Sequence, residues 1–192
     1  IHPKPVQSPH PPVWVAASSP ASVERVVKNR WNLMIGQGEP FESVARQIQS
    51  YRSAVGEAGF DYDPSGVVVA RPMYTAATEE QARRDTHAPF MWFKTTGQEV
   101  GAPPENQVDL LPEQFASYRR RFSRDAGFDY DAMFDNVALF GTPDQVIQRV
   151  ETLRQSGVEN LIFFINYGGI DTQKVHNSLE LFAKEVMPQF SD

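Results

Sequence analysis

The run PVWVAASSPAS at residues 12–22 joins a short apolar segment directly to a helix start. Val13–Ala17 has the length and composition of a buried strand, and serines end it. Ser19 then stands at the N-cap position, Pro20 fits the first helical position and Ser22 the third. Free backbone N–H groups and the positive end of a helix dipole would therefore lie just past the carboxyl end of a strand. That arrangement suits a phosphate group, although an ordinary capped helix also begins in this way.

Length and composition restrict the class of protein. The chain has 192 residues, enough for a single domain spanning residues 1–192, and its net charge of −6 argues against a nucleic-acid or anionic-membrane partner. The absence of cysteine excludes disulfides and thiolate metal sites and fits a reducing compartment. No apolar run approaches the ~20 residues of a membrane span, and no secretory signal is visible. We therefore expect a cytoplasmic location and no metal.

Three further apolar runs have the pattern of strands followed by helices. They are residues 31–36, 66–74 and 160–166. Residues 160–166 form the most hydrophobic of these runs, so we expect them to be covered on both faces. Together with Val13–Ala17 they give four βα units, which indicates a parallel sheet with helices outside it.

The alternation breaks down in the middle of the chain. Thr78-Glu79-Glu80-Gln81 has the pattern of a capping box, and we expect the helix that it starts to end near Ala88, before Pro89. Glycine and proline then become frequent and apolar residues rare between Thr95 and Asp109. We predict a long mobile loop over about 95–111, because loops of this length in compact domains commonly have a function.

Four βα units make half of an eight-unit barrel, whose usual length is about 250 residues. An open doubly wound sheet is the structural alternative, but it would normally carry a G-x-G-x-x-G turn, and this sequence has none. Because the chain begins Ile-His-Pro and enters a strand almost at once, we expect a fragment of a longer protein.

Six motifs, in order and sensibly spaced, resemble the C-terminal half of the luciferase-like flavin monooxygenases, the family of bacterial luciferase. They are KPVQ (4–7), PHPPVWVA (9–16), ASSPAS (17–22), LFGTP (139–143), SGV (156–158) and SLELFAKEVMP (178–188). The resemblance extends over nearly the whole chain. It implies a (βα)8 TIM barrel to which this chain supplies about strands five to eight.

The resemblance also implies a cofactor and a place for it. In this family the turn after strand five binds the flavin phosphate, which assigns that role to Ala17, Ser18 and Ser19 through backbone groups, with Ser22 as a side-chain donor. The ends of the other strands would face the flavin ring and the substrate. The candidates there are Gln37 for the cofactor and Asn166 and Tyr167 for the substrate, although a strand-ending amide is often a backbone cap.

The predicted loop lies where the family carries a mobile lid that keeps water from the flavin. The family's active-site histidine belongs to the early strands, which this chain lacks, and its four histidines do not match that position. We therefore name no catalytic residue. We expect the N-terminal half of the barrel as another chain or segment, because a half-barrel leaves sheet edges and one sheet face uncovered.

The resemblance implies a monooxygenase that uses reduced FMN, supplied by a separate flavin reductase, and O₂ to oxidise a small organic molecule. Two alternatives remain open. One is a hydride-transfer oxidoreductase of the same fold that uses the deazaflavin F420, and the other is a non-catalytic flavin-binding or structural subunit. A homo- or heterodimer is expected in each case.

Overall fold

The computed structural model describes residues 4–8, 10–102 and 128–191. Five parallel strands form its sheet: β1 (Trp14–Ala16), β2 (Asn32–Ile35), β3 (Val67–Thr75), β4 (Leu139–Gly141) and β5 (Asn160–Phe164). The long strand β3 lies between β2 and β5, and the short β4 pairs with its carboxyl end. The four expected strands are therefore present, and β4 is an addition that the sequence did not predict.

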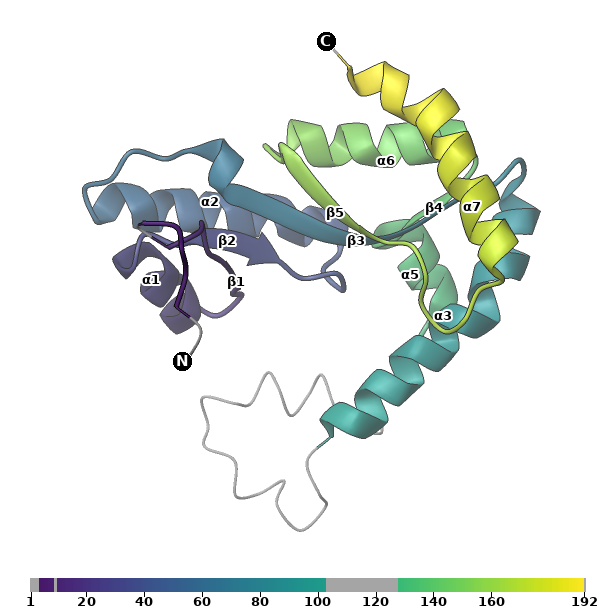
Figure 1. Ribbon diagram of the computed structural model, residues 1–192, viewed down its shortest axis with the longest axis horizontal. Helices are drawn as coiled ribbons and strands as arrows, with labels where there is room; N and C mark the ends of the chain where they lie inside the picture. Colours follow the sequence, from purple (N-terminus) through teal and green to yellow (C-terminus); the bar gives the residue numbers. More distant parts are fainter. Residues whose placement is uncertain (1–3, 9, 103–127, 192) are drawn as a thin grey trace.

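Helices connect the parallel strands (Figure 1). They are α1 (Pro20–Lys28), α2 (Phe41–Glu57), α3 (Glu79–Gly101), α5 (Tyr130–Asn136), α6 (Pro143–Gln155) and α7 (Thr172–Leu181). A 3₁₀ turn (Pro64–Gly66) precedes β3, and α7 continues into a π-helical turn (Phe182–Val186) and a 3₁₀ turn (Met187–Phe190). The described part of the chain is thus an α/β unit with a parallel sheet, as predicted. None of its helices is long and apolar enough to cross a membrane.

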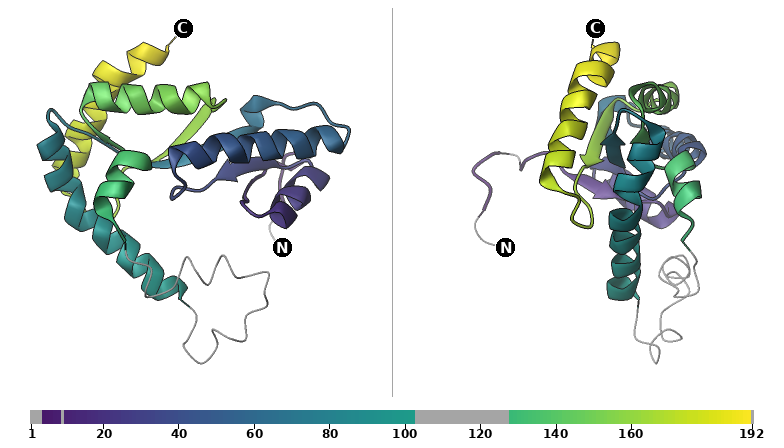
Figure 2. Two further views of the ribbon diagram at one scale, coloured as in Figure 1. Left: turned by 180° about the vertical axis from the view of Figure 1, so that it is seen from behind. Right: turned by 90° about the vertical axis from the view of Figure 1, so that its right-hand side faces the viewer.

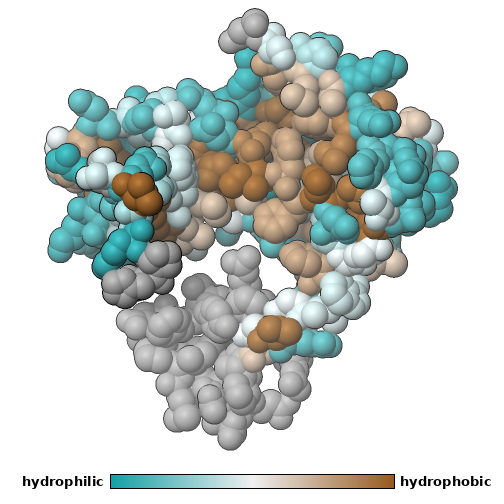
Figure 3. Space-filling model, viewed as in Figure 1, coloured by the Kyte–Doolittle hydropathy of each residue, from teal (hydrophilic) through white to brown (hydrophobic). Residues whose placement is uncertain are grey.

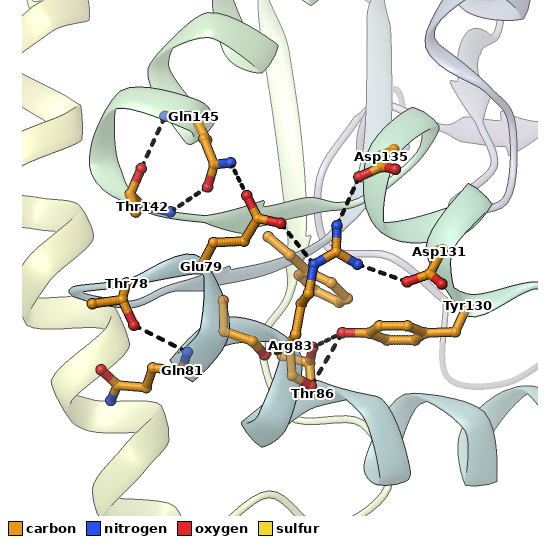
Figure 4. Close-up of polar contacts among 12 residues, drawn as sticks. Thr78, Glu79, Gln81, Arg83, Thr86, Tyr130, Asp131, Asp135, Thr142 and Gln145 are labelled. Atoms are coloured by element: carbon orange, nitrogen blue, oxygen red, sulfur yellow. Dashed lines mark hydrogen bonds and ion pairs between the residues drawn. The ribbon is translucent and has the colours of Figure 1, made fainter.

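Two helices begin with reciprocal capping boxes. Ser19 and Ser22 cap α1, and Thr142 and Gln145 cap α6. At α3 only the forward half forms: the Thr78 hydroxyl accepts a hydrogen bond from the Gln81 N–H at 3.1 Å, and Figure 4 shows the Gln81 side chain pointing away from Thr78. The capping box expected at Thr78 is therefore a simple N-cap.

One face of the sheet is well buried against helices. Alternate residues of β2 and β3, such as Leu33, Ile35 and Val69, pack with the inner faces of α1, α2 and α6 (Figure 2). In α2, the residues Val44, Ile48, Tyr51 and Val55 are all buried against this face. A second, aromatic cluster lies between α3, α5 and the end of β3.

The opposite face of the sheet is exposed at β1 and β5, whereas every residue of the central strand β3 is buried. Trp14, Ile162 and Phe164 are 40%, 42% and 39% exposed, and every second residue of β5 faces outward. The expectation that residues 160–166 are covered on both faces is therefore wrong for this chain, because helices lie on one side of β5 only. Figure 3 shows hydrophobic residues gathered across the middle of the molecule on this side.

Helix α3 does not end before Pro89 but continues to Gly101. Proline removes one helical hydrogen bond, at a cost of about 3 kcal/mol. Burial of the next residue, Phe90, against Phe140 and Tyr167 offsets this cost. The loop predicted from Thr95 is therefore helical up to Gly101, and its remaining part falls within 103–127, outside the described residues.

Candidate active site

The carboxyl ends of parallel strands meet at one edge of a sheet, and the predicted site residues follow β1, β2 and β5 there. Ser18 and Ser19 follow β1, Gln37 follows β2, and Asn166 and Tyr167 follow β5. The shared edge brings three separate segments of the chain to the same end of the sheet.

The turn after β1 forms as predicted, with its two serine side chains bonded to each other. The Ser22 hydroxyl donates to the Ser19 carbonyl at 2.8 Å and accepts from the Ser19 N–H at 3.0 Å. The Ser22 N–H in turn donates to the Ser19 hydroxyl at 3.3 Å. Ser22 could therefore donate to a phosphate only by giving up its bond to the Ser19 carbonyl.

Two backbone donors of this turn are free within the described part of the chain. The N–H groups of Ser18 and Ala21 make no hydrogen bond to another described residue, and Ser18 is exposed. Pro20 has no N–H to offer. The predicted backbone donors Ala17 and Ser19 already donate, to the Met34 carbonyl and to the Ser22 hydroxyl. Free N–H groups at the start of a helix attract anions, and the helix dipole adds to that attraction. The backbone of the turn, rather than its hydroxyls, is thus the available anion-binding element.

Gln37 is partly buried, and its side-chain oxygen has no hydrogen-bond partner among the described residues. It lies in a β-turn closed by a bond from the Glu39 N–H to the Gly36 carbonyl at 3.4 Å. The same carbonyl accepts from Nη1 of Arg71 at 3.1 Å. Sequence analysis missed Arg71, although an arginine inside the buried run 67–75 is a clear anomaly.

The two substrate candidates differ in their surroundings. Asn166 is exposed, whereas Tyr167 is 2% exposed and stacks on Phe140 with ring centroids 5.6 Å apart. Burial raises the pKa of Tyr167 well above its usual value, and its hydroxyl has no partner among the described residues. In this structure Tyr167 is a core side chain, and only Asn166 is accessible to a ligand.

A groove lies beside the β1 turn, among the outer helices. It has a volume of about 1080 Å³ between α1 and α2, and Ala17 and Ser18 stand at its rim. The groove opens among the outer helices, whereas a barrel's ligands bind at the carboxyl ends of its strands. We therefore retain the turn, and not the groove, as the candidate site.

A polar network holds α3 to α5 and α6, as Figure 4 shows. Arg83 donates to Glu79, Asp131 and Asp135, and its guanidinium lies 3.9 Å from the ring centroid of Phe134. Hydrogen bonds from Arg83 and Gln145 hold the pKa of Glu79 below its usual value. These groups satisfy one another, so we assign the network to stability. No set of three or more His, Cys, Asp or Glu side chains that could hold a metal occurs in the described residues.

A buried carboxylate ties the end of β3 to α7. Asp85 accepts from the Tyr74 hydroxyl at 3.1 Å and from Lys174 Nζ at 2.7 Å, and its side chain is 2% exposed. Burial alone would raise the pKa of Asp85, but the hydrogen bonds from Lys174 and Tyr74 outweigh burial and lower it. The contact fixes the segment after β5 against α3.

We expect Asp85→Asn to lower the free energy of unfolding by about 1 to 2 kcal/mol at pH 7, since the charge-assisted bond is lost while Lys174 stays half exposed. Because the folded-state pKa is lowered, this stability is present above the unfolded pKa of about 4 and is lost as pH falls through the folded pKa. Urea denaturation measured from pH 7 to 3 should show that the free energies of unfolding of the wild type and the variant become equal in acid. The control Asp135→Asn, at a more exposed carboxylate, should cost under about 0.5 kcal/mol. A difference in the free energy of unfolding that is the same at all pH values would contradict a stabilising role for the ionised Asp85 carboxylate.

Comparison with known proteins identifies the family of this chain. Residues 1–160 match the luciferase-like monooxygenases, and the chain belongs to that family. It is 26% identical over 194 residues to the oxygenase component of a flavin-dependent trigonelline monooxygenase from Acinetobacter baylyi, covering 99% of this chain and 51% of the relative. The resemblance predicted from the motifs is thereby confirmed.

Solved structures similar to this chain have the same fold. The oxygenating constituent of 3,6-diketocamphane monooxygenase from Pseudomonas putida, in complex with FMN, matches 94% of this chain and 49% of its own, with a TM-score of 0.65 and 22% identity. The coenzyme F420-dependent tetrahydromethanopterin reductase from Methanopyrus kandleri matches 94% of this chain and 51% of its own, with a TM-score of 0.57 and 20% identity. The chain thus spans about half the length of these relatives, and its parallel sheet corresponds to half of a luciferase-like TIM barrel.

Proposed function

We propose that this chain is the C-terminal half of the catalytic barrel of a flavin-dependent monooxygenase that oxidises a small organic molecule with reduced FMN and O₂. The observation that carries the proposal is the turn after β1, whose free Ser18 and Ala21 N–H groups lie at a helix start beyond a strand end. The bound flavin would supply the redox chemistry. The chain's own residues would bind and orient it.

The residues present fit a flavin in two respects. The backbone N–H groups of the β1 turn suit its phosphate, and the unpaired side-chain oxygen of Gln37 suits an N–H of the ring. Asn166, exposed after β5, is the accessible candidate for the substrate. Tyr167 would hold the segment that carries Asn166 in place, because its buried ring packs among Phe90 and Phe140.

The open sheet face supports a partner for this chain. Trp14, Ile162 and Phe164 expose apolar surface that the first half of a barrel would bury, whether as another chain or as a segment of the same protein. A flavin reductase would supply the reduced cofactor. The protein would form a homo- or heterodimer in the cytoplasm. The Acinetobacter relative is named as the oxygenase component of its enzyme, which is consistent with such a two-protein system.

An F420-dependent hydride transfer is the second candidate, because the likeness to the Methanopyrus reductase favours it and the deazaflavin presents a similar phosphate. A non-catalytic flavin-binding or structural subunit is the third, because this chain spans only half of its relatives. The absorbance spectrum of the bound cofactor separates FMN from F420. Oxygen uptake with reduced flavin and a small aldehyde or ketone separates an enzyme from a structural subunit.

We expect the purified native protein to contain this 21.6 kDa segment together with a further set of βα units, and to bind FMN. Intact mass, N-terminal sequencing and an absorbance spectrum of the same sample check both points. A lone, stable 192-residue species without bound flavin would contradict the proposal.

A further inference from the structure

Arg71 is a fully buried arginine inside the apolar strand β3. Its Nη1 donates to the carbonyls of Ala70 at 2.9 Å and Gly36 at 3.1 Å, and its guanidinium carbon lies 5.6 Å from the ring centroid of Phe41. Its Nε and Nη2 atoms have no hydrogen-bond partner among the described residues. The guanidinium therefore makes one contact to a turn and leaves much of its donor capacity unused.

No described acidic side chain forms an ion pair with Arg71. Burial lowers the pKa of Arg71 to about 10, and the charge of Glu39 opposes that shift, so the side chain is still cationic at neutral pH. A buried charge without an ionic partner is costly, and apolar replacements of buried ionic groups are often neutral or stabilising. Stability alone does not explain an arginine here.

The register places Arg71 beside the candidate site. Ala16 of β1 pairs with Met34 of β2, which in turn pairs with Val68 of β3. Three residues after these positions come Ser19, Gln37 and Arg71. β1 and β2 have ended by then, but β3 continues. The bond from Arg71 to Gly36 shows that the end of β2 still lies against β3 at this level.

The contacted carbonyl is the one that closes the turn carrying Gln37. Gly36 accepts both from the Glu39 N–H and from Arg71, with Gln37 and Gly38 between them at the corner of the turn. A charge-assisted hydrogen bond is worth about 1.5 to 3 kcal/mol, enough to hold a short, partly buried turn in one conformation. Arg71 thus fixes the backbone from which the Gln37 amide projects.

We infer that Arg71 is a positioning residue of the cofactor site, which holds the Gly36–Glu39 turn so that the Gln37 amide meets the flavin or deazaflavin ring. The inference rests on the proposed function for its ligand. Its structural part, the anchoring of the turn, stands on the contacts of Arg71 alone.

The test compares Arg71→Met and Arg71→Lys in the complete protein with the control Arg149→Met. Arg149, which is partly buried, also donates to backbone carbonyls, those of Ala138 and Phe140, but it belongs to α6 and faces Asp135. We expect Arg71→Met to raise the Kd for flavin by about tenfold or more, and Arg71→Lys to recover part of that loss. Arg149→Met should lower the Tm and leave the Kd unchanged. Equal Kd values for wild type and Arg71→Met would overturn the inference.

A double-mutant cycle with Gln37→Ala tests whether Arg71 acts through Gln37. The double variant should bind flavin no more weakly than the worse single variant, because one variant already removes what the other positions. Additive losses of flavin-binding free energy would show that Arg71 does not act through Gln37.

Amide hydrogen exchange separates this inference from the proposed function. Exchange at Glu39 should rise about tenfold or more in Arg71→Met and stay unchanged in Arg149→Met. If the wild type binds neither FMN nor F420, the proposed function fails while exchange still decides whether Arg71 anchors the turn. Unchanged exchange at Glu39 would refute the anchoring.

Discussion

Replacing Gly168 with alanine is expected to lower the free energy of unfolding by about 2 to 4 kcal/mol, since overpacking adds to backbone strain. Gly168 has φ +70°, a conformation that side chains disfavour. A Cβ atom there would overlap the Pro89 carbonyl and lie 2.7 Å from its carbon. Backbone cannot move aside as a flexible side chain can, so the loop after β5 would be forced away from α3.

The neighbouring glycine provides the matched control. Gly169 has a similar φ of +74°, but a Cβ there would meet no atom within 4 Å. Gly169→Ala should therefore cost only the backbone strain of about 1 kcal/mol. Urea denaturation of both variants measures the difference. Equal losses would mean that the contact with Pro89 contributes nothing to stability.

The course of α3 shows where prediction from sequence was wrong. The cap at Ser19 is a local pattern, because the cap and its partner are three residues apart, and it was predicted correctly. The passage of α3 through Pro89 depends on residues far along the chain, since Phe90 packs on Phe140 and Tyr167. A local rule for proline cannot include such contacts.

In the candidate site, too, only the features that depend on neighbouring residues in the sequence could be predicted. The turn at Ser19 could be predicted because strand, cap and helix adjoin in the sequence. The burial of Tyr167 could not, because the strand pattern does not reveal which neighbours surround the residue after its end. Arg71 was visible as an oddity inside a β-branched run, but its contact with Gly36 joins residues 35 positions apart.

Placing a negative charge on the β1 turn should abolish most of its affinity for a phosphate. Ser19→Asp keeps an N-cap oxygen and suits the positive end of the α1 dipole, so we expect stability to change by less than about 0.5 kcal/mol. The carboxylate would repel the FMN phosphate, and the Kd for FMN should rise about 10- to 100-fold.

Riboflavin and a neutral cap make this test specific. Riboflavin lacks the phosphate, so its Kd should be the same for Ser19→Asp and the wild type. Ser19→Asn also caps a helix but carries no charge, so it should bind FMN within about threefold of wild type. Fluorescence titration with both flavins measures these values. If Ser19→Asp bound FMN as tightly as Ser19→Asn, the phosphate would lie elsewhere. If it weakened riboflavin equally, the charge would be acting on the ring and not on the phosphate.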